Sequence, residues 1–472
     1  MTETVSETGS WRELFGRHLG TCTVLAGGVG LYATNEFLTV SMLPSIVADI
    51  GGERLFAWAT TLYLVGSVVA ATTVNPMLVR VGARSSYLMG LTVFALSSLV
   101  SALAPNMQIL VAGRMLQGLA GGLLAGLGYA LINSALPRQL WTRGSALVST
   151  MWGVATLVGP TTGGIFAQLD LWQWAFVSIA FAAALMALLV RKVLPAGHIG
   201  GEKPIAHPVP VWSLLLIGAA ALAVSVAELP QYRIQTFGLL AAAALLVVVF
   251  VIVDWRMHVA VLPRSVFGSG PLKWIYLTMA VQMVAAMANT YVPFFGQKLA
   301  DLSPVESGFL GAALATGWTL AEVVSASLTN RQVIGHVVAV APLVMASGLA
   351  LGAVTQRPYA SLSFVLLWAL ALLITGAGIG MGWPHLAVRA MTAVDDPAES
   401  SAAAAAINIV QLSSGAFGAG LAGVVVNTAP GGEVTSARWL FAVFTALAAL
   451  GFLSSYQATH RDRRSPGRLD DL

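Results

Sequence analysis

Long runs of apolar residues, interrupted by short polar breaks, follow one another along the whole chain. A helix needs about 20 apolar residues to cross a bilayer, and backbone groups in lipid must be hydrogen-bonded within their own segment. These runs are also too long for the strands of a barrel. The pattern predicts fourteen transmembrane helices, at 20–46, 55–78, 86–104, 107–134, 145–168, 171–190, 211–228, 234–253, 274–296, 306–328, 334–355, 359–386, 400–427 and 439–457.

The polar breaks divide these segments into groups of six, two and six. The stretch 195–210 is the only long linker, and it precedes the central pair. We expect an all-α integral membrane protein with a six-helix bundle in 1–194, a cytoplasmic linker and two additional helices in 195–272, and a second six-helix bundle with a cytoplasmic tail in 273–472. The seventh segment is near the lower length limit for crossing, so a non-crossing hairpin is the alternative for the central pair.

Lysine and arginine are distributed unevenly among the predicted loops. With the N-terminus inside, 18 of the 24 basic residues fall in interior loops and tails, five fall in exterior loops, and Arg114 falls within a segment. Because basic loops stay on the cytoplasmic side, this bias predicts that both termini are cytoplasmic and that the protein lies in the cell (inner) membrane.

Composition excludes several classes of function. Charged residues make up 9% of the chain and hydrophobic residues 57%, whereas a soluble domain carries about 25% charge. No segment is left for a soluble catalytic domain, and no phosphate-binding loop, cysteine framework or metal-ligand cluster occurs. We therefore expect neither an enzyme nor a cofactor or metal. The net charge of +4 is spread over loops, so nucleic-acid binding is not expected either.

Three charged residues lie well inside predicted helices, away from their ends. Glu36 is roughly 15 Å from the outer end of the first helix and Arg114 roughly 11 Å from the same surface, so the two could meet across the bundle. A charge at mid-bilayer costs at least about 2.5–3.5 kcal/mol, which favours a role in proton transport for Glu36; a buried ion pair that only fixes helix register is the alternative. Glu322 is either a second titrating site or a residue that reaches the cytoplasmic interface.

Other polar and aromatic residues inside the helices are candidates for lining a substrate cavity. Hydrogen bonds between helices explain the amides, and core filling the tryptophans, at least as well. The candidates are Asn35, Gln117, Trp152, Gln282, Asn289, Trp318, Trp383, Asn408 and Gln411.

Glycines recur every four residues in two helices, at 118, 122 and 126 and in the overlapping pairs 376–380 and 378–382. Such spacing lets helices approach closely, and packing is its simplest explanation. Gly159 and Pro160 differ, because proline inside a helix removes a backbone hydrogen bond and bends the helix. A bend at a bundle interface is a natural place for gating.

Several motifs together resemble one known family across nearly the whole chain. Residues 110–118 match an Arg-x-x-Gln-Gly motif of the fourth span, 153–164 match the Gly-Pro-Thr-Thr-Gly-Gly antiporter motif of the fifth, and 172–176 are similar to a Trp-Arg-Trp-x-Phe opening of the sixth. With the 6+2+6 layout, the chain resembles the fourteen-span drug:proton antiporters of the major facilitator superfamily. Residues 35–44 are similar to the first span of mycobacterial multidrug efflux pumps.

The resemblance implies roles for individual residues. It places Arg114 in proton coupling, Glu36 at the acidic position used for protons or cationic drugs, and Gly159 and Pro160 at the gating kink, within the motif that also contains Gly163 and Gly164. One motif departs from the family. The loop after the second span usually contains Gly and Asp where this chain has Asn75 and Val79, although Arg80, Gly82 and Arg84 are present.

The sequence thus predicts a proton-coupled exporter of amphipathic small molecules, including antibiotics, that works as a monomer among membrane lipids. Two alternatives stay open. The chain could export a cell-envelope lipid or lipid-like metabolite with a lipoprotein partner, or it could be a transport-incompetent membrane sensor or scaffold, for which the altered loop is the one sequence feature.

Overall fold

The computed structural model describes residues 11–71, 73–137, 140–195, 210–227, 232–257, 260–328, 330–394 and 400–462. Most of the predicted linker at 195–210 lies outside these ranges. The described residues form helices joined by turns, with no strand among them. The all-α membrane fold expected from the apolar pattern is therefore confirmed, and each of the fourteen predicted segments is largely helical.

The first bundle is built from the N-terminal part of the chain. Its helices are α1 (Trp11–Arg17), α2 (Leu19–Ile50), α3 (Phe56–Ala71), α4 (Val74–Ala102), α5 (Met107–Ala130), α6 (Ile132–Ala135), α7 (Trp141–Gln168) and α8 (Trp172–Val193), with a short 3-10 turn, η1 (Glu53–Leu55), before α3. The long helices pack as α2 on α7, α3 on α5, and α4 on α5 and α8.

Two helices, α9 (Val211–Val226) and α10 (Arg233–Arg256), pair with each other between the bundles in sequence. The second bundle follows. It comprises η3 (Arg264–Phe267), α11 (Leu272–Ala286), η4 (Met287–Tyr291), α12 (Val292–Ala300), α13 (Pro304–Ala326), α14 (Arg331–Thr355), α15 (Leu362–Thr392), α16 (Ser400–Thr428) and α17 (Glu433–Asp462). The ninth predicted segment is thus two α-helices joined by a 3-10 turn.

By length and composition, eleven of the described helical segments could cross a membrane, and α9 is a shorter apolar helix. The remaining two long helices, α2 and α7, carry polar or glycine-rich stretches. The molecule is a multi-pass membrane protein.

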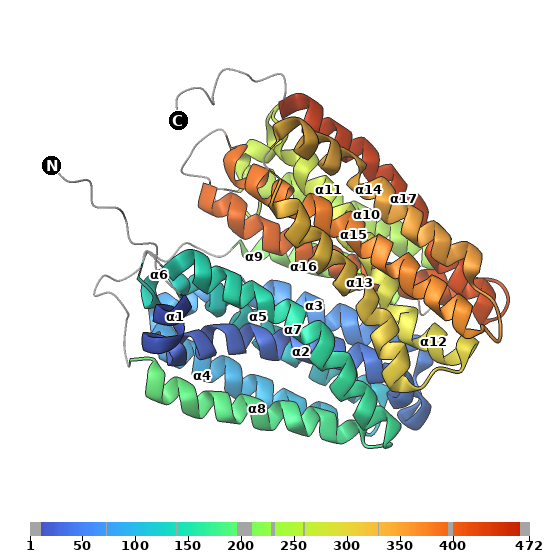
Figure 1. The fold of residues 1–472 in the computed structure, drawn as a ribbon, viewed down its shortest axis with the longest axis horizontal. Helices are drawn as coiled ribbons and strands as arrows, with labels where there is room; N and C mark the ends of the chain where they lie inside the picture. The colour runs from blue at the N-terminus through green and yellow to red at the C-terminus, as the bar shows by residue number, and fades with distance from the viewer. Residues whose placement is uncertain are drawn as a thin grey trace.

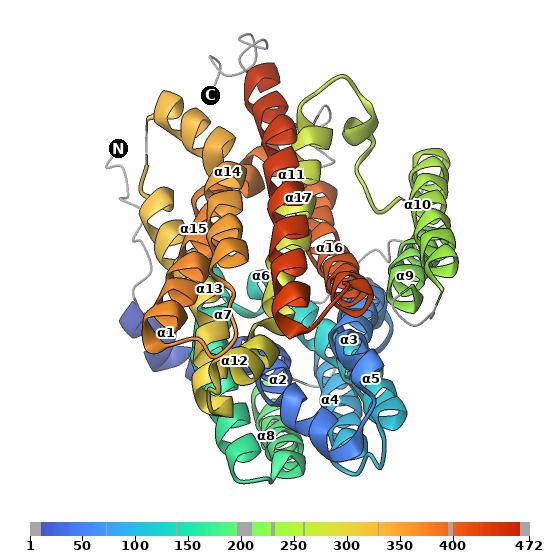
Figure 2. The ribbon, with the colours of Figure 1, turned by 90° about the vertical axis from the view of Figure 1, so that its right-hand side faces the viewer.

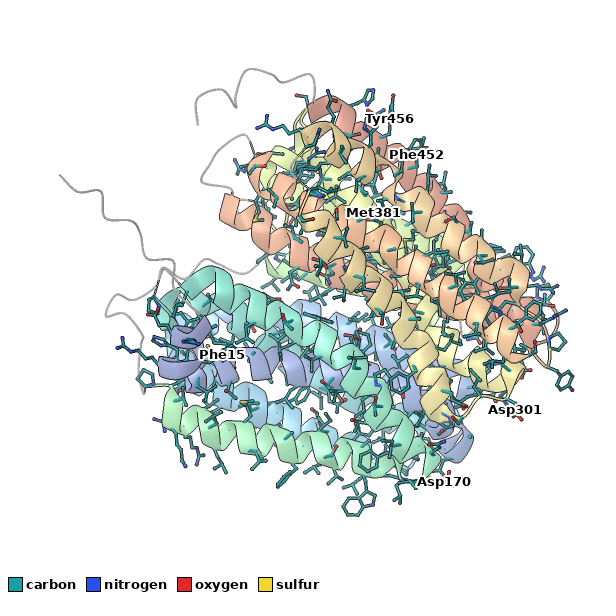
Figure 3. All side chains as sticks on the ribbon, in the orientation of Figure 1. Phe15, Asp170, Asp301, Met381, Phe452 and Tyr456 are labelled. Carbon is teal, nitrogen blue, oxygen red and sulfur yellow. The ribbon has the colours of Figure 1, made fainter. Side chains whose placement is uncertain are left out.

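The two bundles form the arms of a V (Figure 1). α1 and the C-terminal end of α17 lie at one end of the molecule, which we call the terminal end, and α12 lies at the other, the opposite end. The arms diverge toward the terminal end: Phe15 on α1 and Tyr456 on α17 mark their separated tips (Figure 3). Figure 2 shows the same two arms after a 90° turn, with α9 and α10 beside them.

The predicted loop between the second and third segments, 79–85, contains a backbone break, but the residues on either side of this break are helical. α3 ends at Ala71, and helical structure resumes at Val74, through residues expected to form a loop. The break in the backbone lies within α4 at Gly82, whose φ of 78° and ψ of 170° are accessible essentially to glycine alone. Arg80 on the near side of this break is exposed, and Arg84 beyond it is half-buried.

The two bundles repeat one packing device. Gly66 of α3 and Gly118 of α5 each lie against the backbone of the other helix, so that a Cβ at either position would collide with it. Gly317 of α13 and Gly376 of α15 make the same reciprocal contact in the second bundle. These glycine clasps explain the four-residue spacing as close helix packing, and they identify α3 with α13 and α5 with α15 as equivalent helices.

Candidate functional site

Arg114 is fully buried on α5 within the first bundle. Its Nε donates to the carbonyl of Ala59 on α3 at 3.3 Å, and its Nη1 donates to Oε1 of Gln117 at 2.9 Å. Gln117 in turn donates to Oγ of Ser98 on α4 at 2.9 Å. The guanidinium also lies over the ring of Tyr63, 4.0 Å from its centroid, in a cation–π contact. Arg114 therefore joins three helices, and Gln117 holds it in place.

Glu36 lies near the middle of α2 and is half-buried. Its Oε2 is buried and has no hydrogen-bond partner, and the same is true of Nη2 of Arg114 and of both amide atoms of Asn35. The charges of Glu36 and Arg114 interact electrostatically, but no direct ion pair joins them within the described chain. The carboxylate is therefore not neutralised by a salt bridge, and it stands in an apolar bundle with one unsatisfied oxygen.

Aromatic rings surround this part of α2. Tyr32, one turn before Glu36, stacks on Tyr63 with ring centroids 5.2 Å apart, and the Tyr63 hydroxyl donates to the Tyr32 carbonyl at 2.7 Å. Trp152 of α7 meets Tyr32 edge-on at 5.6 Å and Phe37 edge-on at 6.5 Å. Trp152 thus lies beside the Glu36 region as a half-buried side chain. An anion flanked by ring faces is a suitable surface for an apolar cation.

The glycines of the fifth-span motif bring α7 against α2. A Cβ on Gly159 would lie 2.6 Å from Cβ of Phe37, and one on Gly163 would collide with the Leu38 carbonyl. Ser41 of α2 donates to the Pro160 carbonyl at 3.2 Å. α7 is one helix from Trp141 to Gln168 with Pro160 inside it. The motif therefore packs α7 on the helix that carries Glu36.

The same motif also contacts the second bundle. A Cβ on Gly164 would lie 2.6 Å from Cα of Val305, and one on Gly308 would lie 3.1 Å from Cβ of Pro160. Both contacts join the C-terminal part of α7 to the start of α13, at the opposite end of the V. Phe56, at the start of α3, stacks on Tyr291 of η4 with centroids 4.8 Å apart. The two bundles meet here.

In the second bundle the predicted cavity residues form separate groups. Gln282 of α11 is fully buried; its Nε2 donates to the Gly378 carbonyl at 3.2 Å, and its Oε1 has no partner. Asn289 of η4 is half-buried with an unpartnered Oδ1. The rings of Trp318 and Trp383 lie 5.5 Å apart between α13 and α15, which favours core filling.

The second bundle contains three further residues that were predicted to belong to the site. Glu322 is half-buried one turn after Trp318, Asn408 is exposed on α16, and Gln411 is half-buried on the same helix. In the described part of the chain, no hydrogen bond or ion pair joins any of these second-bundle residues to Glu36 or Arg114. The structure thus brings together Asn35, Glu36, Arg114, Gln117 and Trp152.

Two polar features were not predicted. Asp254, buried at the end of α10, accepts the N–H of Val261 at 2.7 Å and that of Leu262 at 2.9 Å, which fixes the chain after α10. Nε2 of His385 lies 3.0 Å from Oγ of Ser325, linking α15 to α13. A carboxylate near a helix end and a lone histidine carry no spacing signal that would have identified either contact.

The sequence matches one protein family and is similar to several known proteins. The family model described as Major Facilitator Superfamily matches residues 25–419. A protein of Mycobacterium tuberculosis strain H37Rv, named probable multidrug-efflux transporter, is 75% identical over 470 residues, which are 99% of this chain and 100% of the relative. The multidrug transporter protein MdtP of Bacillus subtilis is 24% identical over 400 residues, 83% of this chain and 72% of the relative.

Solved structures show the same fold. A bacterial homologue of the human lysosomal transporter Spinster, in an inward-facing and unoccupied conformation, superposes with a TM-score of 0.65 at 12% identity, covering 97% of this chain and 99% of that one. A D-xylose-proton symporter superposes with a TM-score of 0.66 at 15% identity, covering 94% and 99%. These similarities extend over both bundles and confirm the architecture.

Proposed function

Because the chain belongs to the major facilitator superfamily, a family of transporters and not of enzymes, we propose that it exports amphipathic small molecules in exchange for protons. The observation that carries the proposal is the Glu36 carboxylate, which stands in an apolar bundle with a buried, unpartnered oxygen beside Arg114 but without an ion pair to it. Ionisable groups kept inside a membrane despite their cost usually mark transport routes.

The surroundings of Glu36 support a preference among solutes. Tyr32 and Phe37 lie on either side of Glu36 along α2, and Trp152 meets both of their rings edge-on. Rings attract both apolar groups and cations. We infer that the preferred solutes are amphipathic and mostly apolar, and that those with a positive charge bind best. The names of the relatives, multidrug-efflux transporter and multidrug transporter, agree with export of several such compounds.

The bias of basic residues supports placing the terminal end in the cytoplasm of an inner-membrane protein. The V would then be the conformation open to the cytoplasm. In the proposed cycle, Glu36 binds a proton from outside as a solute is released there, and it loses the proton to the cytoplasm as the next solute binds. One carboxylate serves both ligands in turn, because protonation removes the charge that attracts the solute.

Arg114 has a positioning role in this cycle. Its bonds to Ala59 and Gln117 hold a fixed positive charge near Glu36. That charge acts on the carboxylate at the step in which the proton leaves and the next solute binds, before the arms move again. Glu322, in the other bundle, is a second site for protons in the proposal.

The test is solute uptake into inverted membrane vesicles under an imposed pH gradient, acid inside. Wild-type protein should accumulate a lipophilic cation, and the Glu36→Gln variant should accumulate no more than vesicles without the protein. Glu433→Gln, which neutralises an exposed carboxylate at the start of α17, is the matched control and should behave as wild type. Full gradient-driven uptake by Glu36→Gln would refute the role of Glu36, and gradient-independent uptake by the wild type would refute antiport.

A further inference from the structure

The contact between His385 and Ser325 joins α15 to α13 in the terminal half of the second bundle. Nε2 of His385 lies 3.0 Å from Oγ of Ser325 and 3.1 Å from the carbonyl oxygen of the same residue. Ser325 is buried and His385 is half-buried. Met381, one turn before His385, lies on the second arm between Asp301 and Tyr456 (Figure 3). This polar contact has no part in the site of the first bundle.

The hydrogen bonds of Ser325 determine which nitrogen of the imidazole carries a hydrogen. The Ser325 hydroxyl donates its one hydrogen to the carbonyl of Met381 at 2.7 Å, so its oxygen can only accept from His385. The Ser325 carbonyl is an acceptor as well. Because both groups that face Nε2 are acceptors, Nε2 bears a hydrogen whether the ring is neutral or charged. The neutral ring therefore has its free lone pair on Nδ1.

This arrangement lets Nδ1 bind and release a proton while the contact between the helices is kept. A proton that adds to Nδ1 forms an imidazolium whose Nε2–H still donates to Ser325, and loss of that proton restores the neutral ring with the same bond. If Nε2 were instead the acceptor of the contact, protonation would break it. The ring thus combines a fixed attachment with a free nitrogen of the kind that serves as a proton shuttle.

Glu322 lies on the same face of α13 as Ser325, one turn farther from the terminal end. Side chains three residues apart along a helix are neighbours, so the Glu322 carboxylate and the His385 imidazole both adjoin Ser325. Glu322 is half-buried, and no charged group of the described chain forms an ion pair with it. Because α13 ends at Ala326, the imidazole lies between Glu322 and the terminal end.

The other charged groups around His385 are basic. Arg389, one turn later on α15, acts on the imidazole electrostatically. α16, which also packs on α15, has no titratable side chain between Ser400 and Thr428. Glu322 is therefore the one carboxylate beside His385 in the described chain. The remaining titratable residues at the terminal end of the helices packed against α15 are Arg331 and His336 on α14 and Lys273 on α11.

We propose that His385 carries protons between Glu322 and the cytoplasm while Ser325 holds its ring in position, and we call this pathway the relay. The inference rests on the proposed proton-coupled export and assigns the route by which a proton leaves the second bundle. The carboxylic acid of Glu322 gives its proton to Nδ1, which leaves a carboxylate and an imidazolium. Nδ1 then releases the proton to water at the cytoplasmic face, and the neutral ring returns with its Nε2–H bond to Ser325 unbroken.

The first test uses His385→Gln, whose amide can still donate to Ser325 but cannot carry a proton. In inverted vesicles, acid inside, its gradient-driven uptake of ethidium should fall by about a hundredfold, the smaller end of what a positioned proton-transfer group contributes. Exchange of labelled for unlabelled ethidium without a pH gradient should stay at the wild-type rate, because exchange moves no net proton. His336→Gln, at an exposed histidine of α14, is the matched control and should retain both activities.

Restoration by a buffer distinguishes proton transfer from a structural role. Inverted vesicles expose the cytoplasmic face, so imidazoleacetate in the medium, a charged imidazole that does not cross the membrane, can accept the proton in place of His385. It should restore gradient-driven uptake by His385→Gln, whereas betaine at the same concentration, which has no group that titrates near neutral pH, should not. Loss of both uptake and exchange, with no restoration by imidazoleacetate, would show that His385 only joins the helices and would overturn the relay.

The position of the hydrogen is tested without transport, by nuclear magnetic resonance of protein with isotope-labelled histidines. The neutral ring of His385, identified by the signal that His385→Gln lacks, should carry its hydrogen on Nε2. A hydrogen on Nδ1 would overturn the relay, because no lone pair would then face the proton donor.

The export proposal and the relay fail in different ways. If wild-type uptake of ethidium ignores the pH gradient, proton antiport is refuted and the relay falls with it. If the wild type responds to the gradient and His385→Gln takes up ethidium at the same rate, export stands and the relay is wrong.

Discussion

The contact between Gly164 and Val305 predicts how a single methyl group shifts the conformation of the whole molecule. In the structure, a Cβ on Gly164 would lie 2.6 Å from Cα of Val305, a backbone atom that cannot move without α13. Gly164→Ala should therefore destabilise the V, whose arms meet at this point, and it leaves conformations in which the opposite end opens unaffected. Overpacking of a tight interface costs typically about 1–3 kcal/mol.

Converted to populations, that range is a reduction of about 5-fold to 150-fold in the ratio of the V to the alternative conformation. The assay is the distance distribution between spin labels at Phe15 and Tyr456, which are exposed at the tips of the two arms. The wild type should show mainly the long separation, and Gly164→Ala should transfer much of that population to a shorter one.

The matched control is Gly153→Ala. Gly153 lies on the same face of α7, about three turns away, and its added Cβ would meet open space. This variant should retain the wild-type distance distribution. An unchanged distribution in Gly164→Ala, or an equal change in both variants, would refute the argument that the opposite-end contact sets the conformation.

Three further variants test other parts of the structure. Arg114→Lys keeps the charge but replaces the two guanidinium nitrogens that serve Ala59 and Gln117 by one ammonium nitrogen, so the two buried hydrogen bonds lose their geometry. We expect a loss of about 1–3 kcal/mol, read as a lower melting temperature in detergent, and weaker proton coupling in vesicles; wild-type values of both would contradict the role of Arg114. Gly82→Ala forces a side chain into a glycine-only backbone conformation and should destabilise the protein by about 1–3 kcal/mol, whereas Gly238→Ala on α10, where an added Cβ meets open space, should not. Asp254→Asn replaces one of two accepting oxygens by a donor and should lower the melting temperature by the equivalent of about 1–3 kcal/mol; an unchanged value would show that the chain after α10 is held by other contacts.

The order of the long apolar helices followed from the sequence because lipid imposes a minimum apolar length on every crossing segment. Boundaries were less accurate where helices continue beyond the apolar run. α4 begins at Val74, and the polar residues before Gly82 are helical because a membrane helix can extend into the headgroup region. Hydropathy identifies the part of a helix that lies in lipid and not the point at which the helix ends.

The candidate site was predictable only in part, for a physical reason. Glu36 and Arg114 stand out because charge is rare inside apolar segments. Tyr32 and Tyr63 do not, since an aromatic residue in a membrane helix has the same composition signal whether it faces lipid, the core or a ligand. Their stacking, and the position of the Arg114 guanidinium over Tyr63, depend on which helix faces which. The place of α9 against α3 and α16 likewise depends on its packing partners, which an apolar run does not encode.

The repeated glycine clasp shows where the two bundles stop being equivalent. Arg114 lies four residues before Gly118, and the residue four before Gly376 in the equivalent helix is Leu372, which is buried in an apolar core. The backbone packing is thus duplicated, while the buried cation occurs in one copy. If protonation drives the cycle, its electrostatic consequences act first within the first bundle and reach the second through shared contacts such as that between Gly164 and Val305. The helix that carries the glycine motif, α7, packs on the Glu36 helix by one face and on α13 by another. In the proposed cycle, α7 is therefore the element that would convert a change of charge at Glu36 into a change of angle between the arms.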